Sequence, residues 1–145
     1  MHIDHFTIQI ETFSKEKVWL LCEREAPAKA AELRAFECSH GYTLPPEYAL
    51  VATTWGFGEF GYTEILSIRQ GVWSIDDRRK DAPGLPANFV PISENGCGDF
   101  YGFEIKNGKC QSHIVFADHE SYYQLTSTQF DDLYEYLNRF GFNKA

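Results

Sequence analysis

The sequence has few basic residues for a chain of its size. Its 13 Lys and Arg residues face 21 Asp and Glu residues, which gives a formal net charge of −8 at pH 7. Proteins that bind nucleic acids normally carry a basic excess, so DNA and RNA are not expected partners. An acidic surface speeds encounter with a cationic protein and disfavours anionic lipid. The charge favours a basic partner, although solubility alone also accounts for it.

Long apolar runs are missing as well. No window approaches the roughly 20 apolar residues that a membrane-spanning helix needs. The first residues, "MHIDHFTIQIETF", have neither the basic start nor the apolar run of a signal peptide. We therefore expect no membrane segment and a cytoplasmic location.

Cysteine is scarce and scattered. Cys22, Cys38, Cys97 and Cys110 form no Cys-x-x-Cys pair, whereas a structural zinc site normally includes at least one closely spaced ligand pair. In a reducing compartment such cysteines are free, partly buried thiols. We expect neither a bound metal nor a cofactor.

The chain does contain enough apolar material for one core. Its 145 residues fall within the usual size of one domain, and 43% of them are apolar. The 12 Phe and 8 Tyr residues favour strands and helices packed on a sheet over a thin helical bundle. We expect residues 1–145 to form a single domain.

The first half of the chain contains two helical patterns. Residues 5–11 alternate apolar and polar side chains, which predicts a half-buried strand. Residues 17–23 are either a second strand or the start of a helix, with the strand preferred. Helices are predicted over 26–41, ending at Gly41, and over 44–56, opened by a Pro-Pro pair.

The second half has the character of an antiparallel sheet. A glycine-rich bend leads into a strand over 62–68, and a charged surface connection follows over 76–86. Asn-Gly pairs at 95–96 and 107–108 are strong turn signals. Strands are expected on either side of these turns, over 88–92, 100–105 and 110–116.

The last predicted element is a helix over 129–141, capped by Ser127 or Thr128. Its buried stripe is predicted to be Phe130, Leu133, Tyr134, Leu137 and Phe140. Helices early, a run of strands, and a closing helix indicate an α+β fold, in which an antiparallel or mixed sheet packs against helices.

Glycine motifs resemble nucleotide-binding loops by letter only. "GFGEFG" at 56–61 matches Gly-x-Gly-x-x-Gly, but it follows a predicted helix and precedes a strand, the reverse of the dinucleotide-binding context. "GCGDFYG" at 96–102 lacks the Lys of a phosphate loop. Cys97 is not a promising nucleophile either, because nearby Glu94 and Asp99 would raise the pKa of its thiol.

The best acid–base or metal-binding candidates are consecutive residues at the end of a predicted strand. Asp118 and Glu120 could share one side of the chain with His119 opposite, and two carboxylates with a histidine can bind Mg²⁺ or support hydrolysis. The alternative is a polar loop with His119 hydrogen-bonded to the backbone, and this alternative is preferred.

Several of these segments, taken in order, resemble one known family. "AFECSHGYTLPPEYALVATTWGFGEFG", "NFVPISENGCGDFYGFEI", "VFADHE" and "TSTQFDDLYEYL" are similar to successive signatures of the SUKH superfamily, typified by the yeast Smi/Knr-type cell-wall-assembly regulators. The resemblance covers residues 25–140. The positions that carry it are Glu37, Gly41, Leu44, Pro45, Tyr48, Gly56, Gly58, Gly98, Asp99 and Phe130.

The resemblance implies an α+β domain without catalysis. Bacterial members of the superfamily are largely immunity proteins that bind and neutralise a cognate toxin, often a nuclease, and eukaryotic members are regulatory interaction modules. A basic toxin domain is therefore the expected partner. A regulatory or scaffold module for an endogenous partner is the alternative, and a metal-dependent hydrolase that uses Asp118, His119 and Glu120 is a remote one.

Candidate contacts with a basic partner are exposed acidic residues. They are Glu59, Asp76, Asp77, Asp99, Asp118 and Glu120. Asp99 is also expected to anchor the turn that precedes "FYGFEI". The predicted strands of segment 1–24 could add to a sheet edge and pair with a second copy, so that a homodimer is possible.

Overall fold

The computed structural model describes residues 1–17 and 23–144. Its helices are α1 (Ile3–Glu16), α2 (Ala30–His40), α3 (Pro46–Thr54), α4 (Ile75–Asp81) and α5 (Leu133–Tyr136), with a 3₁₀ turn η2 (His119–Ser121) and a π-helical turn η3 (Leu137–Gly141). Its strands are β1 (Arg24–Glu25), β2 (Phe57–Phe60), β3 (Thr63–Ile65), β4 (Phe89–Glu94), β5 (Phe100–Lys106), β6 (Lys109–Asp118) and β7 (Gln124–Ser127).

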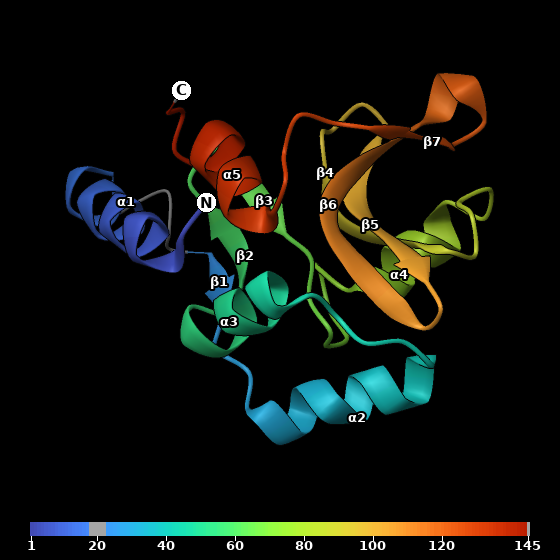
Figure 1. The fold of residues 1–145 in the computed structure, drawn as a ribbon, viewed down its shortest axis with the longest axis horizontal. Helices are drawn as coiled ribbons and strands as arrows, with labels where there is room; N and C mark the ends of the chain where they lie inside the picture. Colours follow the sequence, from blue (N-terminus) through green and yellow to red (C-terminus); the bar gives the residue numbers. More distant parts are fainter. Residues whose placement is uncertain (18–22, 145) are drawn as a thin grey trace.

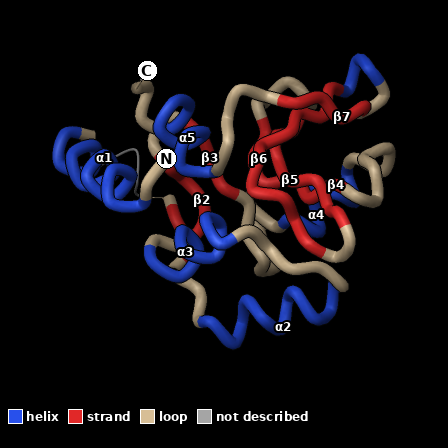
Figure 2. Tube along the Cα trace, in the orientation of Figure 1, coloured by secondary structure: helices blue, strands red, loops and turns tan. Residues whose placement is uncertain are grey.

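The strands form two antiparallel sheets, one ordered β1-β2-β3 and the other β4-β5-β6-β7. Figure 1 shows α1 at one end of the molecule and the four-stranded sheet at the other, with the small sheet and α5 between them. The sheets meet where the backbone N–H of Leu66 donates to the carbonyl of Ile92 at 2.7 Å. The α+β class is therefore confirmed, and the strands are divided between two sheets (Figure 2).

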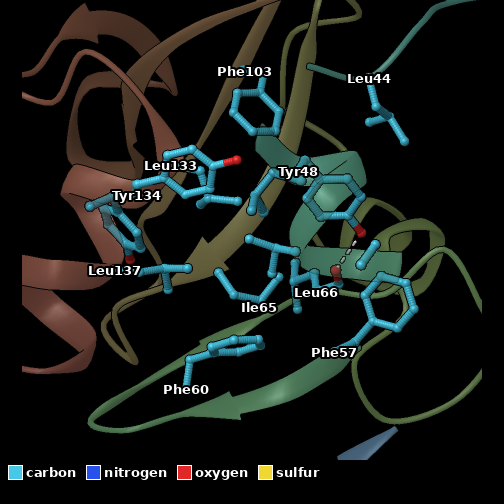
Figure 3. Packing of buried hydrophobic residues seen from close by; sticks show 14 of the residues in the cluster. Leu44, Tyr48, Phe57, Phe60, Ile65, Leu66, Phe103, Leu133, Tyr134 and Leu137 are labelled. Atoms are coloured by element: carbon cyan, nitrogen blue, oxygen red, sulfur yellow. Dashed lines mark hydrogen bonds between the residues drawn. The ribbon is translucent and has the colours of Figure 1, made fainter. Parts of the chain in front are cut away.

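The main core lies where both sheets meet α3 and α5. Tyr48 of α3 is fully buried, and its hydroxyl donates to the carbonyl of Leu66 at 2.8 Å. Figure 3 shows this bond within a cluster to which α3, both sheets and α5 contribute side chains. Phe103 and Leu133, each 0% exposed, join the four-stranded sheet to α5. Burial of a large apolar side chain contributes about 1.5–3 kcal/mol, so this contact region dominates the packing.

The hairpin predicted around Asn107-Gly108 is confirmed. Strands β5 and β6 pair up to Lys106 and Lys109, and the two turn residues have φ angles of 53° and 73°. Two positive φ values are what a type I′ turn requires, and Asn-Gly adopts them at little cost. The helices predicted over 26–41 and 44–56 are confirmed as the slightly shorter α2 and α3, and Gly41 is the left-handed C-cap of α2.

The strand predicted over 5–11 was wrong, because this segment lies in α1. Phe6, Ile10 and Phe13 are buried at helical spacing, whereas Ile8 is 62% exposed. Alternation over so few residues does not separate a period of 2 from one of 3.6. Phe6 stacks on Tyr134 with ring centroids 4.9 Å apart. The other predicted strand, 17–23, has residues 18–22 outside the described part of the chain. The homodimer was expected from strands of segment 1–24 that pair at a sheet edge. Because residues 3–16 form a helix, they do not offer such a strand.

Two other segments also differ from prediction. The charged connection predicted over 76–86 begins as α4, because the hydroxyl of Ser74 accepts from the backbone N–H of Asp77 at 3.2 Å and caps a helix. The glycine-rich bend contains strand β2. Gly58 has a φ of 100°, and a Cβ there would lie 2.7 Å from the carbonyl oxygen of Glu23. Glycine thus lets the segment before α2 approach β2 closely.

The end of the chain contains a strand that the sequence did not predict, β7, before its last helix. Thr128, a predicted cap, donates its hydroxyl to the carbonyl of Ile114 at 2.6 Å, while Asp132 is the actual N-cap of α5. No helix among the described residues is both long and apolar enough to cross a membrane.

Candidate functional site

Two surface hollows lie on either side of one ion pair. Arg78 of α4 donates from Nη1 to Oε2 of Glu94, at the end of β4, over 2.5 Å, and from Nη2 to the carbonyl of Val72 over 2.8 Å. Both residues line a hollow of about 560 Å³ on one side and a hollow of about 500 Å³ on the other. The Arg78–Glu94 pair thus forms a wall that the two hollows share.

The larger hollow, here called the aromatic hollow, is lined by three packed rings. The centroids of Tyr101, Tyr136 and Phe140 are 5.0–5.5 Å apart. The hydroxyl of Tyr136 donates to Oγ of buried Ser93 at 2.8 Å, and burial raises the pKa of this phenol to about 12. The complete lining is Tyr62, Thr63, Glu64, Arg78, Glu94, Asn95, Gly96, Tyr101, Tyr136 and Phe140.

Phe140 reaches this hollow because the last helix widens into a π turn. The backbone N–H of Phe142 donates to the carbonyl of Leu137 at 3.0 Å, an i→i+5 bond. The wider turn brings Phe142 to the core at 3% exposure and leaves Phe140 38% exposed. The prediction that Phe140 belongs to the buried stripe was therefore wrong. Turns of this kind are rare and are frequently found at functional sites.

The smaller hollow, here called the α4 hollow, lies between α4 and the ends of β4 and β5. Asp77 and Asp81 are one helical turn apart on α4, and both line it. Phe100 and Tyr123, whose ring centroids are 6.2 Å apart, contribute the apolar part of its wall.

Beside the α4 hollow, Asp99 and His119 form a close pair. Oδ1 of Asp99 accepts from the backbone N–H of His119 at 2.9 Å and from its Nδ1 at 2.6 Å, and Oδ2 accepts from Asn95 at 2.9 Å. Burial opposes ionisation of Asp99, but the hydrogen bonds from Asn95 and His119 lower its pKa to about 2. The same contact with Asp99 raises the pKa of His119.

The structure brings together some of the six predicted contact residues. Asp77 lines the α4 hollow and Asp99 lies beside it. Asp118 and Glu120 flank His119, and Oδ1 of Asp118 accepts from the backbone N–H of Glu120. Asp76, in contrast, contacts Nε2 of His40 at 2.9 Å and lines another hollow.

Glu59, the sixth residue, is on the small sheet. It is the direct cross-strand partner of Glu64, which lines the aromatic hollow. Neither Glu64 nor Glu94 was selected from the sequence. No local pattern distinguishes them from other exposed acids, because tertiary contacts with Trp73 and Arg78 give them their place.

In the structure, Asp99 takes the place that the sequence analysis gave to Glu120 in the acid–base trio. Ligand atoms of Asp99, Asp118 and His119 lie within 4.8 Å of one another, and among the described residues no group of three candidate metal ligands includes Glu120. Asp118 caps the η2 turn, and Asp99 accepts a hydrogen bond from Nδ1 of His119. Each of these groups thus already has a hydrogen-bonding role within the fold.

The residues that carry the family resemblance occupy structural positions. Glu37 accepts from the backbone N–H of Leu44 at 2.6 Å and so fixes the α2–α3 connection. A Cβ at Gly56 would lie 2.1 Å from the carbonyl oxygen of Glu25. Others are buried in the core, namely Leu44, Tyr48 and Phe130.

Comparison with known families identifies the family to which the chain belongs. Residues 30–137 match the family model SUKH_6, described as SMI1-KNR4 cell-wall. The match covers more than half of the chain, which therefore belongs to the SUKH superfamily, in its SMI1-KNR4 family. A search of curated proteins found no match.

Proposed function

We propose that this chain is a non-catalytic protein-binding domain, a bacterial immunity protein that acts in the cytoplasm and neutralises a cognate toxin of the nuclease type. Membership of the SUKH superfamily supports a protein-binding role, because its bacterial members are largely immunity proteins. The net charge of −8 supports a basic partner. In this proposal the domain inhibits by covering the basic surface with which a nuclease holds its nucleic acid.

The observation that carries the proposal is the grouping of carboxylates around the two hollows. Glu64 and Glu94 border the aromatic hollow, and Asp77 and Asp81 border the α4 hollow, across a shared wall. Asp99 lies next to them. Acidic groups gathered in this way raise the rate of encounter with a basic surface.

The rings beside these carboxylates supply apolar contact area. Binding energy at protein interfaces is concentrated in a few buried aromatic and arginine anchors, while charges at the rim mostly affect the association rate. Tyr101 and Phe140 in one hollow and Tyr123 in the other are suitable anchors. The face thus combines acidic groups that speed association with aromatic rings that slow dissociation.

The test is co-expression with the toxin encoded beside the gene, followed by size-exclusion chromatography of the two proteins. We expect surviving cells and one co-eluting complex. The double variant Asp77→Asn/Asp81→Asn should associate about tenfold more slowly at low salt and lose much of the salt dependence. The matched control Asp4→Asn/Glu11→Gln removes the same charge from exposed positions on α1 and should associate like the wild type.

Two outcomes would contradict the proposal. Cells that die despite expression of the chain, with separate elution of the two proteins, would remove the immunity role. A pull-down from the native cells that recovers an endogenous housekeeping protein, with no toxin gene nearby, would favour the regulatory or scaffold alternative.

A further inference from the structure

The aromatic hollow has the chemistry of a receptor for a guanidinium group. We propose that it receives an arginine side chain of the partner protein, which inserts between the exposed rings and pairs with the carboxylates at the edge. This inference depends on the proposed function in one respect only, namely that the partner is a protein. The contacts within the hollow provide the rest of the argument.

The walls present accessible ring surface. Tyr62 is 58% exposed and Phe140 is 38% exposed, whereas Tyr136 behind them is only 2% exposed. Tyr136 is held by its bond to Ser93, and Tyr101 packs against it. Phe140 packs against both of these rings, and Tyr62 packs edge-on against buried Phe13, with ring centroids 6.1 Å apart. A guanidinium stacks on such rings by a cation–π contact, and a preorganised wall reduces the entropy lost on binding.

Two carboxylates at the edge have unused acceptors. Oε2 of Glu64 accepts from Nε1 of Trp73 at 2.8 Å, and Oε2 of Glu94 accepts from Arg78. Oε1 of each glutamate makes no hydrogen bond within the described part of the chain. The side chains are thus oriented by one oxygen while the other remains open to a cationic donor.

Arginine fits this combination better than the other candidate groups. Its planar guanidinium can stack on a ring and still direct N–H groups at carboxylates in the same plane, which a lysine ammonium cannot do. Bases of single-stranded nucleic acid also stack on tyrosines, but such platforms have basic grooves. Here Glu64 and Glu94 would repel the phosphates.

Trp73, which contacts a residue of the hollow, can report binding there. Because the indole N–H of Trp73 donates to Glu64, a cation that pairs with Glu64 changes the NMR signal of that N–H. The probe is the tripeptide Gly-Arg-Gly, added to the ¹⁵N-labelled full-length protein, with the signal assigned by Trp73→Phe. Gly-Lys-Gly tests for planarity, and Gly-citrulline-Gly is a neutral control of the same shape. We expect a saturable shift with arginine, a weaker response with lysine and none with citrulline.

Variants locate the binding site. Glu64→Gln and Tyr62→Ala should each raise the Kd for Gly-Arg-Gly about fivefold, the loss of one ion-pair or cation–π contact. Glu11→Gln and Tyr122→Ala remove the same groups from exposed positions that line neither hollow and should leave the Kd unchanged. An equal response to citrulline, unchanged binding in both hollow variants, or a stronger response to oligothymidylate would overturn the inference.

Failure of this inference and failure of the proposed function give different results. If the wild type and the two hollow variants all neutralise the toxin and bind it equally well, the immunity role stands and the arginine receptor is wrong. If the tripeptide binds as described but no toxin is neutralised, the arginine receptor stands and the immunity role is wrong.

Discussion

Oδ1 of Asp99 accepts two hydrogen bonds from one residue, His119, at 2.9 Å from its backbone N–H and 2.6 Å from Nδ1 of its ring. Asp99 ends the turn between β4 and β5, whereas His119 begins η2 after β6. The pair therefore ties two chain reversals together at one end of the four-stranded sheet, beside the α4 hollow.

The first prediction concerns the ionisation of this pair. Asp99→Asn should lower the pKa of His119, because the hydrogen bond to the Asp99 carboxylate is the main cause of its raised value. An NMR pH titration of the ring protons measures the change. Asp131→Asn is the control, since it removes an exposed carboxylate that contacts His113 instead. An unchanged pKa in Asp99→Asn would contradict the assignment.

The same pair predicts a pH window for stability. His119 has a raised pKa, so its contribution is complete below the ordinary value of 6.5 and disappears as pH rises through the raised value. Asp99 has a lowered pKa, so its contribution is complete above 3.8 and disappears as pH falls through about 2. Denaturation of wild type and Asp99→Asn should therefore differ most between these limits. A difference that does not vary with pH would contradict the linkage.

The third prediction separates backbone strain from steric overlap at two glycines. Gly56 and Gly96 have φ angles of 91° and 79°, but a Cβ lies 2.1 Å from a carbonyl oxygen at Gly56 and has no neighbour within 4 Å at Gly96. Gly96→Ala should cost about 1–2 kcal/mol for the left-handed conformation alone. Gly56→Ala should cost clearly more in chemical denaturation, and equal costs would show that the approach of β1 to this loop is not tight.

The buried hydroxyl of Tyr48 gives a fourth prediction. Tyr48→Phe leaves the carbonyl of Leu66 without its donor in the core, so the free energy of unfolding should fall by about 1–3 kcal/mol. Tyr122→Phe serves as a control because Tyr122 is 93% exposed, and no loss is expected there. Equal stability of the two variants would mean that water replaces the bond.

Thiol reactivity gives a fifth prediction. Cys38 and Cys97 are exposed, whereas Cys110 is buried, and burial together with the charge of Glu37 raises the pKa of its thiol to about 12. In a Cys22→Ser background, two thiols should react rapidly with a disulfide reagent at pH 8 and the third only in denaturant. Three rapid reactions would contradict the placement of Cys110.

Local signals predicted much of the fold. The Asn107-Gly108 turn and the helices that became α2 and α3 have sequence patterns that few other structures fit. Helix α1 was missed because Phe6, Ile8 and Ile10 satisfy a strand period as well as part of a helical one. Only tertiary packing, which buries Phe6 and Phe13 and exposes Ile8, distinguishes the two.

The candidate site was less predictable for the same physical reason. Asp77 and Asp99 were selected as exposed acids, and both lie in or beside the α4 hollow. Glu64 and Glu94 were not selected, since contacts with distant residues give them their orientation. The outward position of Phe140 depends on a π turn, and a helical wheel of period 3.6 assigns that residue to the core.

Helix α1 also affects where the protein can be cut. Helix α1 lies before the family match at residues 30–137, and Phe142 lies after that match. Both nevertheless pack into the core, because Phe6 stacks on Tyr134 and the rings of Phe13 and Phe142 are 5.0 Å apart. A fragment expressed with the boundaries of the match would lose three of these four rings and expose Tyr134. Exposed apolar surface of this kind promotes aggregation. The packed core thus extends beyond the matched segment on both sides.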